Sequence, residues 1–269
     1  MNKVVVLAGG IGNQLFQLAA GFNKFDSFSV YLDNLNRYKS KRKSIVGVLT
    51  PNIKRYKGSF IFKLLLKSKI TYKLSIPFIF NDINYFFGEI FMSGYFQNYK
   101  KNISGIKKIS RIVENHTRTV QKKLENKIIF EQEYSIAIHI RLGDYLNESD
   151  FWIFDKEYLS KSLREFSQVK KIYIFCPNSL PLQILSVLNK LSVEIFFIKD
   201  LGLSDDEEFI LLSCFKNLII SNSTFSYWAG IINHNKIPKK IIAPNMFYKN
   251  KNKNISWINN CIEAKFKVL

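Results

Sequence analysis

The sequence predicts an α/β protein whose parallel sheets are covered by helices on both faces. Short apolar runs without alternating polar residues recur along the chain, and such runs are typical of strands buried on both faces. Segments of helical length separate the runs, so strand and helix alternate. This alternation favours parallel strands joined by helical crossovers.

A β-α-β unit is predicted at the start of the chain. The apolar run Val4–Ala8 reads as a strand and is followed by three glycines. An amphipathic helix is expected over Asn13–Phe25, and a second strand over Ser29–Leu32, ending at Asp33. The order strand, glycine turn, helix, strand is the usual opening of a nucleotide-binding α/β domain.

The same alternation returns from Tyr134 onward, which predicts a second α/β block. The charged stretch Gln121–Gln132 separates the blocks, so we expect two domains, residues 1–133 and 134–269. The strands predicted in the second block are Ser135–Ile140, Lys171–Phe175, Val193–Ile198, Asn217–Ser221 and Lys240–Ala243. The helices predicted between them are Lys156–Phe166, Leu180–Leu191, Asp205–Phe215 and Thr224–Asn233.

Composition narrows the class of protein and of partner. With 47% hydrophobic and 15% aromatic residues the chain is expected to fold rather than stay disordered. A net charge of +19 predicts an anionic partner: nucleic acid, an anionic membrane, or a phosphorylated small molecule. Three widely spaced cysteines fit a reducing compartment, and the N-terminus lacks the apolar core of a signal peptide, so we expect a cytoplasmic protein.

A basic segment between the two blocks predicts peripheral contact with an anionic membrane. Residues Asn34–Asn81 hold twelve Lys or Arg and no acidic residue. Within them Ser59–Ile70 mixes apolar and basic positions at helical spacing, as segments lying on a bilayer do. A buried helix whose lysines extend to water explains the pattern equally well.

The glycine turn near the N-terminus is a candidate phosphate site. Gly10 and Gly12 lie between a predicted strand and a predicted helix, where bare backbone N–H groups can face an anion. The same glycines match part of a dinucleotide fingerprint with Asp33 as the ribose acid, but Leu15 stands at its third glycine. A simple tight turn is the third alternative.

A second candidate site follows the first strand of the second block. Strand alternation places His139 and Arg141 on one side, and Asp144 follows in the loop within reach of Arg141. An arginine fork matches the oxygens of a diphosphate. A structural pair of Arg141 and Asp144, with His139 in the core, is the alternative.

Two further segments are candidate sites, one rich in hydroxyl groups and the other acidic. Ser221–Gly230 leads from a strand into a helix, where its hydroxyls either cap the helix or contact a phosphate. Ser204 and Glu207 have the spacing of a capping box rather than of a metal site. Because no cluster of His, Cys or Asp has ligand spacing, no metal is expected.

Three motifs together resemble the α-1,2-fucosyltransferase family of inverting glycosyltransferases, glycosyltransferase family 11. They are Gly9-Gly-Ile-Gly-Asn-Gln14, His139-Ile-Arg-Leu-Gly-Asp-Tyr145 and Ser221-Asn-Ser-Thr-Phe-Ser-Tyr-Trp-Ala229. The segments Gly94–Gln97 and Glu208–Cys214 are also similar to that family. The chain departs from it at Leu142, where the family has a second arginine.

The resemblance implies a fold, an activity and a set of site residues. It implies two Rossmann-like domains facing across a cleft, the GT-B type, with GDP-fucose as donor, inversion at C1 and no metal or other cofactor. The acceptor would be a sugar hydroxyl, namely the 2-OH of a galactoside. Together with the basic charge and the lack of a signal peptide, the resemblance leads us to expect a lipid-linked glycan at the inner face of a membrane. Catalytic roles fall on His139, Arg141 and Asp144, and donor contacts on Gly10, Gly12, Asn13, Arg141, Ser223 and Thr224.

Two other functions stay open on the residues alone. A nucleotide-dependent oxidoreductase would use the glycine turn and Asp33. A nucleic-acid-binding protein would use the basic charge, although no binding module is recognisable and nucleic acid is not the expected partner.

Overall fold

In a computed structural model the chain divides into two units, Met1–Ile112 and Val113–Leu269. The structure describes residues 2–32, 52–57, 83–86, 89–124, 133–176, 178–232, 239–250, 254 and 266–269.

A four-stranded sheet forms the centre of the first unit. Its order is β2-β1-β4-β3, with β1 parallel to β2 and to β4 and with β3 antiparallel to β4. Only two residues separate β3 from β4 in the sequence, a connection that allows antiparallel pairing alone. The strands are β1 (Lys3–Leu7), β2 (Ser29–Leu32), β3 (Ile83–Phe86) and β4 (Glu89–Met92).

Helix α1 (Ile11–Lys24) connects β1 to β2, so the predicted β-α-β start is confirmed. Most of its apolar residues are buried, and Leu15 and Leu18 are fully so. Helix α5 (Ile103–Leu124) approaches α1 so closely that a Cβ on Gly105 would lie 1.8 Å from the carbonyl oxygen of Ala19. That contact admits glycine alone.

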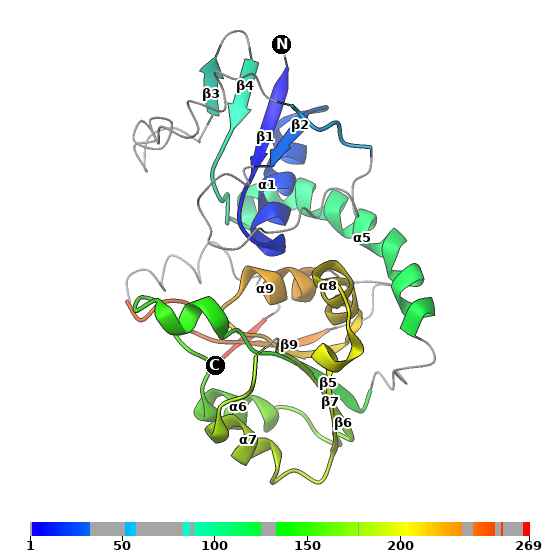
Figure 1. The fold of residues 1–269 in the computed structure, drawn as a ribbon, viewed down its shortest axis with the longest axis vertical. Coiled ribbons are helices and arrows are strands. Elements are labelled where there is room, and N and C mark those ends of the chain that lie inside the picture. Colours follow the sequence, from blue (N-terminus) through cyan, green and yellow to red (C-terminus); the bar gives the residue numbers. More distant parts are fainter. Residues whose placement is uncertain are drawn as a thin grey trace. The chain divides into compact units, whose positions relative to one another are not determined.

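The second unit is built on a six-stranded parallel sheet of order β10-β9-β8-β5-β6-β7 (Figure 1). Numbered within the unit, this is the doubly wound order 3-2-1-4-5-6 of Rossmann folds, and the direction of winding reverses between β5 and β8. The strands are β5 (Ser135–His139), β6 (Lys171–Phe175), β7 (Glu194–Phe197), β8 (Asn217–Ile219), β9 (Lys240–Ala243) and β10 (Lys267–Val268).

Helices cover both faces of this sheet, as predicted. Figure 1 shows α6 and α7 on one face and α8 and α9 on the other. The helices are α6 (Lys156–Leu163), α7 (Leu182–Leu188), α8 (Asp205–Cys214) and α9 (Thr224–Ile231). Three short 3-10 turns are η1 (Lys100–Asn102), η2 (Gly143–Asn147) and η3 (Ile198–Leu201).

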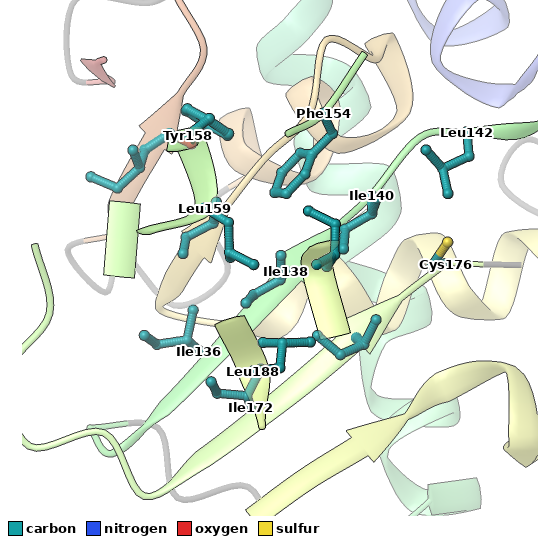
Figure 2. Packing of buried hydrophobic residues seen from close by; sticks show 14 residues of the cluster. Ile136, Ile138, Ile140, Leu142, Phe154, Tyr158, Leu159, Ile172, Cys176 and Leu188 are labelled. Atoms are coloured by element: carbon teal, nitrogen blue, oxygen red, sulfur yellow. Dashed lines mark hydrogen bonds between the residues drawn. The ribbon is translucent and has the colours of Figure 1, made fainter. Parts of the chain in front are cut away.

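Alternation along β5 divides its residues between the two faces. Ile136, Ile138 and Ile140 enter the apolar cluster beneath α6 and α7, and Leu142 extends the same series past the end of the strand (Figure 2). His139 faces α9 instead, where its ring stacks on Phe225. The core and the candidate site thus occupy opposite faces of one strand.

The boundary predicted from the sequence lies further along the chain than the division between the two compact units. The charged stretch predicts a boundary after residue 133, whereas the units divide after Ile112, within α5. The first part of the predicted linker, Gln121–Leu124, is the last turn of α5. Val113, Thr117 and Val120 are buried along one face, and this apolar repeat continues the helix despite the charges around it. The assignment of two domains, 1–133 and 134–269, stays a prediction.

None of the helices in the described ranges is long and apolar enough to span a bilayer. Most of the basic segment Asn34–Asn81, including Ser59–Ile70, lies outside the described residues.

Candidate functional site

In the first unit, the glycine turn between β1 and α1 is shaped by Gly9. Its φ of +82° lies in the left-handed region, and a Cβ there would lie 2.8 Å from Nδ2 of Asn13. Gly10 is the N-cap of α1 with an ordinary φ of −72°, and a Cβ on it would have no neighbour within 4 Å. The backbone therefore requires glycine at position 9, whereas position 10 leaves open space in front of the helix.

Three buried or half-buried glutamines hold this turn. Gln14 donates from Nε2 to the carbonyl oxygen of Gly9 at 2.9 Å. Gln17 accepts a hydrogen bond from the backbone N–H of Ala8 and donates to the carbonyl oxygen of Gly94, both at 2.9 Å. Gln97 donates to Oδ1 of Asn13 at 2.9 Å. The two separate sequence motifs Gly9–Gln14 and Gly94–Gln97 are thus one hydrogen-bonded structure.

A pair of alanine substitutions separates the structural glycine from the candidate ligand-facing one. Gly9→Ala is expected to lower the free energy of unfolding by about 1–2 kcal/mol, the cost of a left-handed conformation for a residue with a Cβ. Gly10→Ala is expected to leave stability unchanged and to lower activity if the ligand approaches the backbone at this position. Urea unfolding and turnover of both variants measure the two effects, and equal losses of stability would contradict the assignment.

In the second unit, His139 is a buried, neutral side chain at the end of β5. Its Nδ1 shares a hydrogen bond of 2.8 Å with Oγ of Ser221, and its ring stacks on Phe225 with centroids 5.3 Å apart. Burial, together with the charge of Arg141, lowers the pKa of His139 to about 3. The imidazole therefore carries no charge at neutral pH, and Arg141 is the charged member of this pair.

Arg141 follows on the same side as His139 and is half-buried. Its Cζ lies 5.3 Å from the centroid of the Tyr145 ring, within range of a cation–π contact. Tyr145 belongs to η2 and donates from its hydroxyl to the carbonyl oxygen of Asn222 at 3.1 Å. The loop after β5 is therefore bonded to the loop after β8.

The turn after β8 leads into the N-terminus of α9. Ser223 is the N-cap, and its Oγ accepts a hydrogen bond from the backbone N–H of Phe225 at 3.3 Å, so the capping role predicted for this segment is confirmed. Thr224 opens the helix and is half-buried. Because β5 and β8 flank the point where the winding reverses, both loops meet at the edge where doubly wound sheets bind ligands.

Leu142 points away from this edge. It is 2% exposed and belongs to the apolar cluster that includes Ile140 and Phe154 (Figure 2). The position at which the related family has a second arginine is therefore part of the core here.

Charges of both signs gather near the end of β6. Burial raises the pKa of the Cys176 thiol; Lys199 and Arg141 act on it in the opposite direction, and Glu208 acts with burial. Glu208 lies in the first turn of α8, and its own pKa is raised to about 7 by burial and by Asp205. Sequence reasoning missed Glu208 as a titrating group, because the neighbouring capping box of Ser204 and Glu207, which is confirmed, already accounts for the acidic run.

The raised pKa of Glu208 predicts a pH-dependent loss of stability. The folded chain holds this proton more tightly than the unfolded chain, whose ordinary value is 4.5, so stability falls as pH rises from about 4.5 to 7 and then levels off. Glu208→Gln removes this loss, so the variant is expected to gain stability over wild type across that window. Urea unfolding from pH 4.5 to 8 measures the difference. Glu157→Gln, at an exposed acid in the first turn of α6, is the control, and a Glu208→Gln difference that is flat with pH would contradict the prediction.

Each unit holds some of the predicted site residues. In the second unit His139 ends β5, Arg141 follows it, and Ser223 and Thr224 lie at the start of α9; in the first unit Gly10 is the N-cap of α1, and Gly12 and Asn13 lie in its first turn. The backbone of Asp144 belongs to η2, but its side chain lies outside the described residues, as does Asp33. Tyr145, Gln17 and Gln97 were missed as functional supports. For Gln17 the sequence does offer a signal, because a glutamine within an otherwise apolar helix indicates a buried hydrogen-bonding role.

Within the described ranges, no group of three or more His, Cys, Asp or Glu side chains is placed to hold a metal ion.

Comparisons with known proteins show the family of the chain and support its fold class. Residues 65–260 match the family described as Glycosyl transferase family 11. The O-antigen biosynthesis glycosyltransferase WbnK of Escherichia coli is 24% identical over 302 residues, covering 94% of this chain and 98% of that protein.

Among solved structures, a glycosyl transferase family 9 protein from Veillonella parvula is similar over 100% of this chain and 86% of its own, with a TM-score of 0.50 and 10% identity. POFUT1 in complex with GDP aligns over 90% of this chain and 98% of its own, with a TM-score of 0.47 and 11% identity. The likeness to the family 9 structure is one of fold, and it supports the α/β class.

Proposed function

The chain belongs to glycosyl transferase family 11 and is a glycosyltransferase, and from this premise we propose that it transfers L-fucose from GDP-fucose to a sugar hydroxyl. The proposed acceptor is the 2-OH of a galactoside, which gives an α-1,2 linkage. The observation that carries the proposal is that the loop holding Arg141 is hydrogen-bonded, through the hydroxyl of Tyr145, to the turn after β8 at the reversal point of the sheet. The relative from O-antigen biosynthesis, which matches nearly the whole chain, supports a role in the synthesis of a surface glycan.

The proposed reaction is a single displacement at C1 of fucose. The acceptor oxygen forms a bond to C1 while the bond from C1 to the β-phosphate oxygen breaks, and the acceptor proton leaves to a base. The electron pair of the broken bond stays on GDP, so negative charge grows on its β-phosphate. A planar, permanently charged guanidinium suits that developing charge, and this is the role proposed for Arg141.

Neighbouring residues have supporting roles in this proposal. His139 is neutral, so it contributes position rather than charge by holding Ser221 through the bond from Nδ1. Ser223 and Thr224 open α9, whose first N–H groups can meet phosphate oxygens. Asp144, and the turn residues Gly10, Gly12 and Asn13, are proposed contacts on sequence alone. No metal is assigned a step, and activity is expected to persist in EDTA.

A thermal-shift panel of GDP, UDP, ADP, CMP and NAD tests the proposed donor. Stabilisation by GDP alone is the expected result, since binding to the folded state raises the melting temperature by mass action. A rise in melting temperature with UDP, ADP or CMP instead would indicate a different nucleotide-sugar donor. A rise with NAD would favour an oxidoreductase. Product analysis by NMR with GDP-fucose and galactosides then tests the linkage.

We also propose that the enzyme works on a lipid-linked glycan at an anionic membrane face. Lys107, Arg111, Arg118 and Lys122 are exposed on α5. At 100° per residue their spacing places them within about 60° of one another, in a stripe roughly 22 Å long. Ile106, Ile109 and Val113 are buried on the opposite side of the helix. Exposed Glu114 lies on the same face, so the four cations and this acid give the stripe a net charge of +3, which is complementary to anionic headgroups.

Liposome co-sedimentation tests this membrane contact. Wild type is expected to sediment with vesicles containing phosphatidylglycerol and not with pure phosphatidylcholine, and the variant with all four stripe residues changed to Gln is expected to stay in solution. Changing Lys156, Lys161, Arg164 and Lys190 to Gln removes the same charge elsewhere and serves as the control. Equal binding by both variants would overturn the proposed surface.

A further inference from the structure

The guanidinium of Arg141 lies against an aromatic ring at the edge of the sheet. Its Cζ is 5.3 Å from the centroid of Tyr145, four residues further along the chain. An arginine side chain is long and loses much rotamer freedom when it is fixed in one position, so a contact that fixes it before the ligand binds favours binding.

The ring of Tyr145 is itself held on two sides. It stacks on Phe151 with centroids 4.3 Å apart and planes 8° from parallel. Its hydroxyl donates to the carbonyl oxygen of Asn222, in the turn after β8. Ring and hydroxyl together leave Tyr145 little freedom to turn.

The partners of Tyr145 are fixed in turn by the loop after β9. Asn222 donates from Nδ2 to the carbonyl oxygens of Trp152 and Phe247 at 2.7 and 2.9 Å. Phe151 forms an antiparallel bridge with Tyr248, and their rings stack with centroids 5.5 Å apart. The loops after β5, β8 and β9 are therefore tied into one structure, and the ring of Tyr145 brings that structure into contact with Arg141.

We propose that Tyr145 is a positioning residue that holds the guanidinium of Arg141 in place for the diphosphate of the donor. The proposal rests on the function proposed above. Where the family has two arginines in succession, this chain has Arg141 followed by Leu142, and Leu142 lies in the core. Arg141 therefore has no second arginine beside it in the sequence, and the residues that pack around it determine its orientation. The ring matters more than the hydroxyl, because the ring makes the contact with Arg141.

The test compares two substitutions of Tyr145 by GDP affinity and by turnover. Tyr145→Leu removes the ring and is expected to weaken GDP binding and lower kcat by about 2- to 30-fold, the range of a cation–π contact. Tyr145→Phe keeps the ring and is expected to stay within about twofold of wild type in both, a rescue that a role for the hydroxyl alone would not give.

A double-mutant cycle on GDP affinity separates positioning from general damage. In an Arg141→Ala background, Tyr145→Leu is expected to change the Kd for GDP by less than about twofold, since the group it positions is gone. If Tyr145→Leu weakens GDP binding equally with and without Arg141, the ring supports the fold only and the proposal is overturned. Should Tyr145→Leu fail to fold, Phe151→Leu, which removes the stacking partner, is expected to show a smaller effect with the same dependence on Arg141.

Tyr134→Leu is the matched control. Tyr134 precedes the same strand β5 at its opposite end, and Nζ of Lys170 lies 4.5 Å from the centroid of its ring. Its loss removes a comparable cation–π contact far from the site and is expected to leave the Kd for GDP unchanged. If wild type itself does not bind GDP, the proposed donor fails; if wild type binds GDP and Tyr145→Leu binds it equally well, only the role of Tyr145 fails.

Discussion

Arg141→Ala is expected to lower kcat by roughly a hundredfold to a thousandfold while the fold persists. A preorganised donor facing charge that develops in the transition state is typically worth about 2.7–4 kcal/mol. Burial, the larger cause of the lowered pKa of His139, persists in this variant, so His139 stays neutral and cannot replace the lost charge. Arg141 is half-buried at the edge of the sheet, so its truncation creates no cavity in the core. Steady-state turnover with GDP-fucose and urea unfolding measure the two halves of this prediction.

Two further variants define the role of Arg141. Arg141→Lys keeps the charge but loses the planar fork, so its activity is expected to lie between that of wild type and that of Arg141→Ala. Arg164→Ala, at an exposed arginine that ends α6, is expected to behave as wild type. Near-normal turnover of Arg141→Ala would remove Arg141 from the mechanism.

Leu142→Arg, which restores the family's arginine pair, is expected to destabilise the protein rather than to improve it. Leu142 is 2% exposed among apolar side chains, so an arginine there would leave an uncompensated charge in the interior. Such charges typically cost about 3–5 kcal/mol. For a domain of this size each kcal/mol shifts the melting temperature by roughly 2–4 °C, so a fall of about 6–20 °C is expected in a thermal scan.

Leu142→Met is the control for this substitution. It conserves volume and apolar character, so it is expected to cost less than about 1.5 kcal/mol. A Leu142→Arg variant with unchanged melting temperature and higher turnover would mean that position 142 faces the ligand and not the core.

The second α/β block was largely predictable because its signals are local. Each of its predicted strands and helices is present, with ends that differ by a few residues, and the alternation that separates His139 and Arg141 from the core is a property of the strand itself. The same alternation assigns Leu142 to the face of Ile136, Ile138 and Ile140. The burial of Leu142 therefore follows from strand alternation, which a comparison with the family motif does not take into account.

The first unit was harder to predict because its contacts are distant in sequence. Helix α5 was missed, although Ile106, Ile109 and Val113 already show a helical repeat, because the lysines that follow resemble a linker. The hairpin of β3 and β4 carries no strong turn signal. The bonds of Gln17 to Gly94 and of Gln97 to Asn13 join residues about eighty positions apart, and no local pattern predicts such pairs.

The hydrogen bonds of Gln17 also bear on how the chain can vary. They tie the chain that follows β4 to the glycine turn after β1, and the two bonded residues lie 77 positions apart in the sequence. The entropy of closing a flexible segment grows only with the logarithm of its length, about 0.6 kcal/mol for each doubling. Extra residues between Gln17 and Gly94 therefore cost the fold little, provided that the pairing of Tyr56 with Val30 and of β3 with β4 is kept.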